Sequence, residues 1–411
     1  MRKTKIAAAR GCLLILLITF HIYCCTAQTK AGIAVNTFEL KNGDRVVFLG
    51  NSLFENDMQY GYLELALTTR FPNRDVTFRN LGWSGDNVFG DARSYYSTPP
   101  TSYELLIEQI TKAKPSLVFL GYGGIEAQEG EAGLSHFKAG LNNLLNKVDS
   151  LGARTVLLSP ISVLSGDSAQ NLAKRNEDIE LYADAISKIA KDRGKRFIDI
   201  FNPIRELAKT QTLTENGIHL NETGYYYLTK EIEKALGLKS SVKTITATVS
   251  KNGSVISEQA KLITPGKEKI TLAFTFKENY LPLPVPAGVS LSEHQMIIIK
   301  GLKKGFYTLS VNNDEVISAS SKKWEEGVLI THGPSFTQVR QLREMILKKN
   351  ELFFFQYRPL NRTYILGFRS YEQGRHVKGL EEQNLIIKWL EGQIALHRVS
   401  NARVYQLTEL K

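Results

Sequence analysis

A serine that follows an apolar run is the first candidate for chemistry in this sequence. In "VVFLGNSLFEN" (residues 46–56), the run stops at Gly50 and Ser52 comes two positions later. A serine hydroxyl becomes a nucleophile when a neighbouring base accepts its proton, so the rest of the sequence has to supply a base and an oxyanion site. One histidine, His219, lies in the polar motif "TENGIHLNETGY" (residues 214–225). Both residues also have an ordinary structural explanation, because Ser52 could cap a helix and His219 could be a packed core histidine.

Two further polar motifs that follow apolar runs carry glycines. Gly85 lies in "NLGWSGD" (residues 80–86), and "GYGGIEA" (residues 121–127) holds two more glycines. A glycine at position 85 permits a tight turn. The motifs also hold three candidate pocket residues, for which core packing is an equally good explanation: Trp83, Tyr122 and Glu126.

The pattern of residues 45–236 predicts the elements that position these motifs. Short apolar runs alternate with segments of helical spacing, and several runs are apolar throughout, as in strands buried on both faces of a parallel sheet. The runs are "RVVFLG", "DVTFRN", "SLVFLGYG", "RTVLLSP" and "RFIDIFN". This alternation predicts a three-layer α/β/α domain with a flavodoxin-like parallel sheet. Ligands of such sheets bind beyond the carboxyl ends of the strands, so we expect the four motifs to meet there.

The helical segments show apolar stripes at spacings of three and four residues. One stripe begins at Tyr103, behind a predicted capping box of Thr101 and Glu104. A second extends from Leu134 to Val148, and a third ends before Gly194. Each stripe predicts a helix that packs on the sheet.

The four motifs, in this order and spacing, resemble the SGNH (GDSL) hydrolase family of esterases and acylhydrolases over residues 45–236. The resemblance implies that Ser52 is the nucleophile and that His219 is the base. It also implies that the N–H groups of Ser52 and Gly85 form an oxyanion hole, as in other serine hydrolases.

Three positions depart from the family pattern. Asn51 stands where the family has an aspartate that shapes the turn. Ile125 stands where an asparagine completes the oxyanion hole, and Asn216 stands where the triad aspartate orients the histidine. Loss of an oxyanion donor is typically worth about 10²–10³ in turnover, and an aspartate-to-asparagine change is worth about 10⁴ in a serine protease. Asn216 could still orient the ring, and Glu215 or Glu126 could supply a carboxylate.

The first 27 residues predict export. A basic start precedes "CLLILLITFHIYCC", an apolar segment too short to span a bilayer comfortably, and "CTA" ends a small-residue cleavage site at Ala27. We therefore expect residues 1–27 to be a signal peptide and the protein to be secreted, periplasmic or held in the cell envelope. A retained anchor or a lipoprotein cysteine is the weaker alternative.

The cysteines and the charge limit the other function classes. All three cysteines (Cys12, Cys24 and Cys25) lie in the leader, so the mature chain has neither disulfides nor thiol chemistry. Removing the leader takes four basic residues and lowers the formal charge from +11 to +7. This modest surplus is spread out, which gives no basic stripe of the nucleic-acid type. The histidines have no partners at ligand spacing, so no metal and no cofactor is expected.

The segment after the α/β domain changes in pattern. We expect residues 28–238 to form the hydrolase-like domain and residues 239–411 to form a β-rich mixed C-terminal domain, with short strands and with helices near 335–348 and 380–396. The aromatic and arginine-rich run at residues 353–376 could bind sugars. We expect it instead to pack within its own region and against the first domain.

Two functions of different classes follow. The first is a secreted hydrolase that cleaves ester bonds, with acyl groups on glycans as the expected substrates, through Ser52, His219 and Asn216. The second is a catalytically impaired relative that uses the same cleft to bind a glycan or a protein partner. The expected partner is a small-molecule or glycan ester, with no nucleic acid and no membrane span after signal cleavage; the oligomeric state stays open.

Overall fold

The structure is a computed structural model that describes most of the chain. The described residues are 38–93, 100–166, 168–238, 244–251, 253–264, 270–289, 294–358 and 377–410. The predicted signal peptide at 1–27 lies outside them. Residues Leu40–Lys411 form one compact unit, separate from Met1–Glu39. The domain boundary expected near residue 238 stays a prediction.

A parallel sheet organises the first part of this unit. Its strands are β1 (Asp44–Gly50), β2 (Val76–Asn80), β3 (Leu117–Gly121), β4 (Arg154–Leu158) and β5 (Arg196–Ile198). The order is β2-β1-β3-β4-β5, and every neighbouring pair is parallel. This is the flavodoxin-like order, in which the chain reverses direction across the sheet between β1 and β3. The predicted fold class is confirmed.

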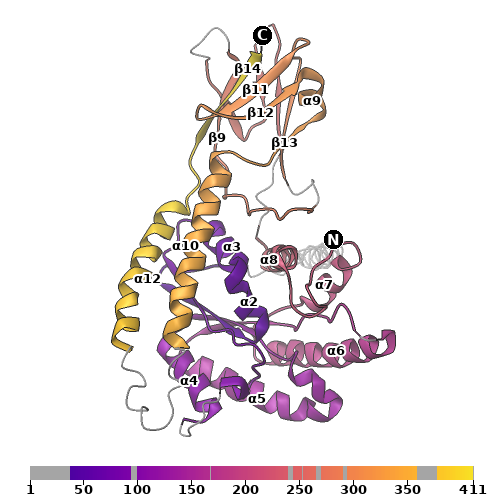
Figure 1. The fold of residues 1–411 in the computed structure, drawn as a ribbon, viewed down its shortest axis with the longest axis vertical. Helices are drawn as coiled ribbons and strands as arrows, with labels where there is room; N and C mark the ends of the chain where they lie inside the picture. The colour runs from indigo at the N-terminus through magenta and orange to yellow at the C-terminus, as the bar shows by residue number, and fades with distance from the viewer. Residues whose placement is uncertain are drawn as a thin grey trace, which may run out of the picture. The chain divides into compact units, whose positions relative to one another are not determined.

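Helices cover both faces of this sheet. They are α2 (Ser52–Tyr60), α3 (Tyr62–Arg70), α4 (Ser102–Ala113), α5 (Gly130–Ser150), α6 (Ala169–Asp192), α7 (Phe201–Leu207) and α8 (Glu222–Ala235). Short 3-10 turns lie at η1 (Asp91–Arg93) and η2 (Glu126–Glu129). In Figure 1, α4 and α5 lie on one side of the sheet, and α2, α3 and α8 lie on the other.

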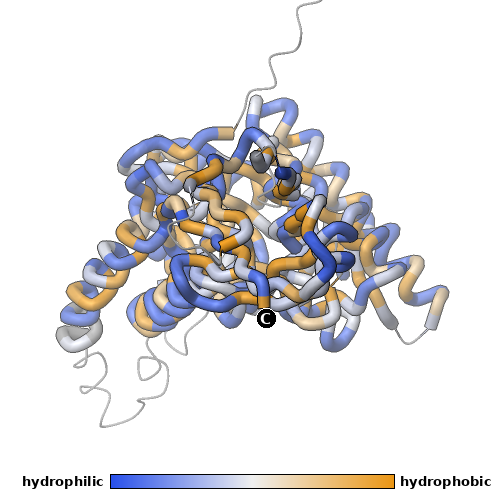
Figure 2. The backbone as a smooth tube through the Cα atoms, turned by 90° about the horizontal axis from the view of Figure 1, so that it is seen from above, coloured by the Kyte–Doolittle hydropathy of each residue, from blue (hydrophilic) through white to orange (hydrophobic). Residues whose placement is uncertain are grey.

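Side chains alternate across the sheet because successive strand residues point to opposite faces. Val47 and Leu49 of β1 are buried in the core cluster that the stripes of α4, α5 and α6 complete. Phe48 points the other way, where its ring lies 5.4 Å from Phe54 of α2. The predicted capping box of α4 is present. Figure 2 shows hydrophobic segments gathered inside, with outer helices that alternate between hydrophobic and hydrophilic positions.

The remaining chain builds two further sheets. One contains β6 (Thr244–Thr248), β7 (Val255–Ile256), β10 (Gln295–Lys300) and β13 (Val328–Ile330), in the order β13-β10-β6-β7. The other contains β8 (Ala260–Leu262), β9 (Ile270–Phe276), β11 (Phe306–Val311), β12 (Asp314–Ser320) and β14 (Arg403–Leu410), in the order β12-β11-β14-β9-β8. A shared core containing Ile297, Leu309 and Trp324 of α9 (Ser321–Glu326) joins them. The predicted mixed, β-rich region is confirmed.

Two long helices connect these sheets to the α/β layers. Helix α10 (Pro334–Tyr357) lies beside α12 (Val377–His397) in Figure 1, and α10 also contacts α2, α3 and β2. The prediction of a helix near 335–348 was too short, because the aromatic run continues it to Tyr357. The buried side of this extension is partly polar: Lys349 Nζ lies 2.6 Å from Glu64 Oε1, and both side chains are almost inaccessible to solvent. A buried ion pair obscures the apolar stripe by which a helix is recognised.

No helix in the described ranges is long and apolar enough to cross a membrane.

Candidate functional site

Ser52 is held at the start of a helix, directly beyond a central strand. Strand β1 ends at Gly50, and a Cβ at this position would lie 2.3 Å from the carbonyl oxygen of Gly121 on β3, so only glycine fits. Asn51 is the N-cap of α2, and its Oδ1 accepts a hydrogen bond from Leu53 N at 3.1 Å. Ser52 is therefore the first helical residue and not the cap. Ser52 therefore lies at the helix N-terminus, which carries a partial positive charge.

The loop after β2 presents Gly85. The residue has φ +78°, a conformation that favours glycine, and it is exposed. Within the described part of the chain, the N–H groups of Ser52 and Gly85 have no intramolecular acceptor. An oxyanion site requires free backbone donors, and Ser52 and Gly85 both line the cavity described below.

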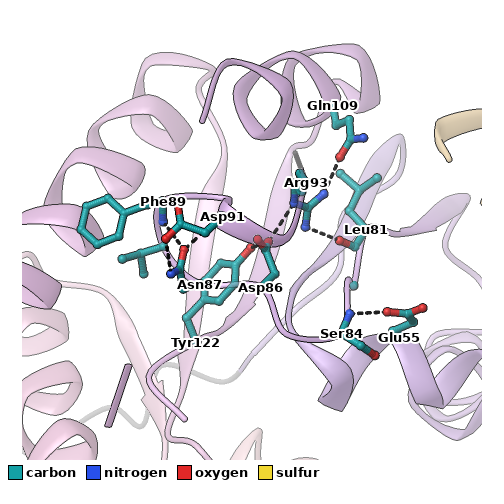
Figure 3. Close-up of polar contacts among 12 residues, drawn as sticks. Glu55, Leu81, Ser84, Asp86, Asn87, Phe89, Asp91, Arg93, Gln109 and Tyr122 are labelled. Atoms are coloured by element: carbon teal, nitrogen blue, oxygen red, sulfur yellow. Dashed lines mark hydrogen bonds and ion pairs between the residues drawn. The ribbon is translucent and has the colours of Figure 1, made fainter. Parts of the chain in front are cut away.

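A buried polar network follows Gly85 directly. Asp86 Oδ2 accepts hydrogen bonds from Arg93 Nε at 2.8 Å and from the Tyr122 hydroxyl at 2.7 Å, and Arg93 Nη2 donates to Leu81 O at 2.8 Å (Figure 3). Burial raises the pKa of Asp86, whereas the charge of Arg93 and the bond from Tyr122 lower it. The network therefore holds the loop through Leu81, which follows β2, and through Tyr122, which follows β3.

Three of the candidate pocket residues are buried and do not line the cavity described below. Tyr122 is the Asp86 partner just described. Trp83 lies beneath a guanidinium group, with Arg93 Cζ 5.2 Å from its ring centre. Glu126 accepts backbone N–H bonds from Val88 at 2.9 Å and from Gly123 at 2.8 Å, and burial raises its pKa to about 7. Glu126 therefore anchors two loops.

His219 stands in an exposed turn that Asn216 organises. Asn216 Oδ1 accepts from the backbone N–H groups of Ile218 at 3.2 Å and of His219 at 2.9 Å. The same amide places its Nδ2 3.2 Å from His219 Nδ1. Because the amide oxygen faces two donors, the amide nitrogen must be the atom that faces the ring. It donates to Nδ1, so a neutral His219 carries its proton on Nε2.

This tautomer is opposite to the one that a general base uses. In a serine triad the carboxylate accepts from Nδ1–H, which leaves the Nε2 lone pair free for the serine proton. Glu215 does not replace that carboxylate: its Oε1 accepts from the Tyr60 hydroxyl at 3.4 Å, while its backbone N–H bonds to the His219 carbonyl. Asn216 thus orients the ring but favours the less productive proton position.

A single cavity of about 600 Å³ brings the candidate residues together. Five residues singled out from the sequence line it, namely Asn51, Ser52, Gly85, Ile125 and His219. Ser52 and His219 line the same cavity, but their side chains are not hydrogen-bonded to each other in the described structure, an arrangement that catalytic pairs often show without substrate. Asn216 does not line the cavity, and it contacts the lining residue His219.

Part of the wall escaped the sequence analysis. Residues 160–163 follow β4 and line the cavity, as do Arg175 and Asp178 of α6. The rule that ligands bind beyond the carboxyl ends of strands gave a signal for residues 160–163, because "RTVLLSP" ends at that edge. For Arg175 and Asp178 the sequence gave none. The lining of the cavity is largely apolar, with Ile125, Ile161 and Ile179 among its residues.

The chain is similar to one protein family in sequence and to several solved structures in fold. The model of the GDSL-like lipase/acylhydrolase family matches residues 48–227. No curated protein matches the sequence significantly. The solved structure of BT4096, described as a gut microbial diltiazem-metabolizing enzyme, is similar with a TM-score of 0.66 and 17% identity, covering 90% of this chain and 99% of that one. Axe2, an acetylxylan esterase from Geobacillus stearothermophilus, gives a TM-score of 0.40 with 18% identity, covering 49% and 98%.

The family match covers every motif that supplies the cavity's polar residues, from the end of β1 to helix α8. Residues 48–227 therefore form a domain of the GDSL-like lipase/acylhydrolase family.

Proposed function

We propose that the protein hydrolyses ester bonds, with Ser52 as the nucleophile and His219 as the proton carrier. The observation that supports this most directly is that Ser52, His219 and the free N–H groups of Ser52 and Gly85 meet in one cavity. Ser52 Oγ attacks the acyl carbonyl carbon while His219 Nε2 accepts the hydroxyl proton. The two N–H groups hold the oxyanion. His219 then returns the proton to the leaving alcohol, and water releases the acid from the acyl-enzyme in the same way.

Asn216 slows this cycle without preventing it. His219 is exposed, so the ring can exchange its proton with water and reach the tautomer with a free Nε2 lone pair. The cost is the hydrogen bond from Asn216 Nδ2 and the absence of a carboxylate to stabilise the imidazolium. Turnover well below that of a complete triad is the expected consequence.

The substrates we propose are short acyl esters on glycans, met outside the cytoplasm. The apolar wall around Ile125 and Ile161 suits an acyl chain, and a cavity of about 600 Å³ also has room for a sugar ring beside it. The leader at residues 1–27 is the ground for proposing export.

A binding protein without catalysis is the second candidate. The Asn216–His219 contact and the isoleucine at 125 favour it, since each removes a group on which the chemistry normally depends. The cavity itself would be used in the same way, to hold an acylated glycan.

Acetate release separates the two candidates. Purified mature protein is incubated with p-nitrophenyl acetate and with O-acetylated xylan, beside Ser52→Ala and the distant surface variant Lys348→Ala as a matched control. Acetate release that is lost in Ser52→Ala and kept in Lys348→Ala supports the esterase. Folded protein that retains acetylated xylan in a pull-down but releases no acetate supports the binding protein.

A further inference from the structure

The end of helix α10 reaches the loop that carries Gly85. The Tyr357 hydroxyl donates to the Gly82 carbonyl at 2.8 Å, and the Tyr357 ring lies 6.3 Å from the Trp83 ring. Gln109 Nε2 of α4 donates to the Tyr357 carbonyl at 3.3 Å, which holds the helix end from the other side. The bond to Gly82 joins residues 275 positions apart in sequence, and the bond from Gln109 joins residues 248 positions apart.

Arg358, which follows the helix, makes a second set of contacts with the same loop. Its guanidinium carbon lies 3.9 Å from the centre of the Trp83 ring, and its Nη1 lies 3.1 Å from Glu55 Oε1. The other oxygen of Glu55 accepts the backbone N–H of Ser84, as Figure 3 shows. Glu55 therefore links Arg358 to the residue directly before Gly85.

The loop is thus fixed on both sides of Gly85. On one side, Gly82, Trp83 and Ser84 are held directly by α10 or through Glu55. On the other side, Asp86 is held by Arg93 and Tyr122. Gly85 stands between these two sets of contacts with its N–H free.

We infer that Tyr357 and Arg358 are positioning residues, which aim the Gly85 N–H at the oxyanion from outside the family domain at residues 48–227. The inference rests on the proposed function for its effect on catalysis. The Arg358–Glu55 pair is partly exposed, with side-chain accessibilities of 33% and 19%, so it contributes little to global stability. Its role is to fix geometry. Displacement of a catalytic group by about 1 Å costs about 10²-fold in rate, so loosening this loop is expected to lower kcat while leaving KM nearly unchanged.

The test uses the full mature chain with Tyr357→Phe, Arg358→Ala, Arg358→Lys and the matched control Lys348→Ala. Lys348 lies on the same helix, and among the described residues its ion-pair partner is Glu351 on the surface. Tyr357→Phe removes one hydroxyl and keeps the ring, so it separates the hydrogen bond from packing. Amide hydrogen exchange of the peptide covering residues 81–86 reports loop order without requiring activity, and kcat and KM for p-nitrophenyl acetate report its catalytic effect.

The inference predicts faster exchange in residues 81–86, by about tenfold or more, in Tyr357→Phe and Arg358→Ala. The α5 peptide stays unchanged, and kcat falls by about 10- to 100-fold with similar KM and thermal midpoint. Arg358→Lys keeps the charge and loses the planar stacking, so partial rescue is expected. Unchanged exchange in residues 81–86 overturns the inference, and so does an equal effect of Lys348→Ala. If wild-type protein has no Ser52-dependent turnover, the proposed function fails, while the exchange data still decide whether α10 holds the loop.

Discussion

Asn216→Asp is the substitution that most directly probes the chemistry of His219. The amide of Asn216 donates to Nδ1 because its oxygen is already used by two backbone N–H groups. A carboxylate in the same place keeps those two backbone bonds through one oxygen and offers the other oxygen to Nδ1. An oxygen requires Nδ1–H, so the proton moves from Nε2 and the ring becomes a base toward Ser52.

The size of the gain follows from two contributions. Reaching the productive tautomer in the wild type costs one ordinary hydrogen bond, about 0.5–1.5 kcal/mol. A carboxylate at the present 3.2 Å separation also attracts the imidazolium. That attraction is about 1.3 kcal/mol at the dielectric of water and about 5 kcal/mol at an effective dielectric of 20. Because His219 is exposed, the lower figure applies. Together they give an increase of about 20- to 100-fold in kcat/KM, below the 10⁴ seen for the buried serine protease residue.

The assay pairs kinetics with the tautomer itself. Hydrolysis of p-nitrophenyl acetate is compared for wild type, Asn216→Asp and Asn221→Asp. The last variant adds the same charge two positions after His219. It keeps the oxygen that caps α8 and loses the bond from Asn221 Nδ2 to Thr212 O. Histidine ¹⁵N spectra should show an unprotonated Nδ1 in neutral wild-type protein and a protonated Nδ1 in Asn216→Asp. Wild-type spectra with Nδ1–H, or a folded Asn216→Asp variant no faster than Asn221→Asp, would refute the reasoning.

Three further outcomes test other parts of the account. Adding Ile125→Asn to Asn216→Asp should raise kcat again, by at most about 10²–10³, as a donor enters the oxyanion site; a folded double variant no faster than Asn216→Asp contradicts this. Burial raises the pKa of Glu126 from its usual 4.5 to about 7 in the folded protein. The free energy of unfolding is therefore highest below the pKa of Glu126 in the unfolded chain. It falls by about 3 kcal/mol as the pH rises from there through the folded pKa. Denaturant midpoints against pH should show that slope in wild type and not in Glu126→Gln. Lys349→Met leaves Glu64 buried without its cation and should lower the free energy of unfolding by about 3–5 kcal/mol. Lys348→Met should lower it by less than about 0.5 kcal/mol. Equal denaturant midpoints for the two variants would contradict the burial of the Lys349–Glu64 pair.

The sequence was sufficient for what depends on local pattern. The buried strands of the parallel sheet, the capping box at Thr101 and the β-rich character of the later region follow from periodicity and turn chemistry, and the structure has them. The motifs containing Ser52, Gly85 and His219 follow strand ends or precede a helix, so the topology of the sheet dictated that they would share an edge.

What the sequence could not supply depends on contacts between distant segments. Lys349 and Asn350 look like solvent-facing helix residues until Glu64 is placed opposite them. The contact of Arg358 with Glu55 likewise joins residues 303 positions apart, and Arg358 also stacks on the distant Trp83. It supports the expected packing of the aromatic run for residues 353–358, and the remainder of that run, 359–376, lies outside the described residues. The proton position on His219 depends on which atoms of Asn216 face the backbone, which only coordinates reveal.

The central claim is that Ser52 is an activated nucleophile, and covalent labelling tests it most directly. Folded mature protein is treated with a fluorophosphonate, and the adduct is located by peptide mass spectrometry. The account predicts one adduct, on Ser52, that is absent in Ser52→Ala and forms much more slowly in His219→Ala. An adduct on another residue, a labelling rate indifferent to His219, or no labelling of folded wild-type protein would contradict it.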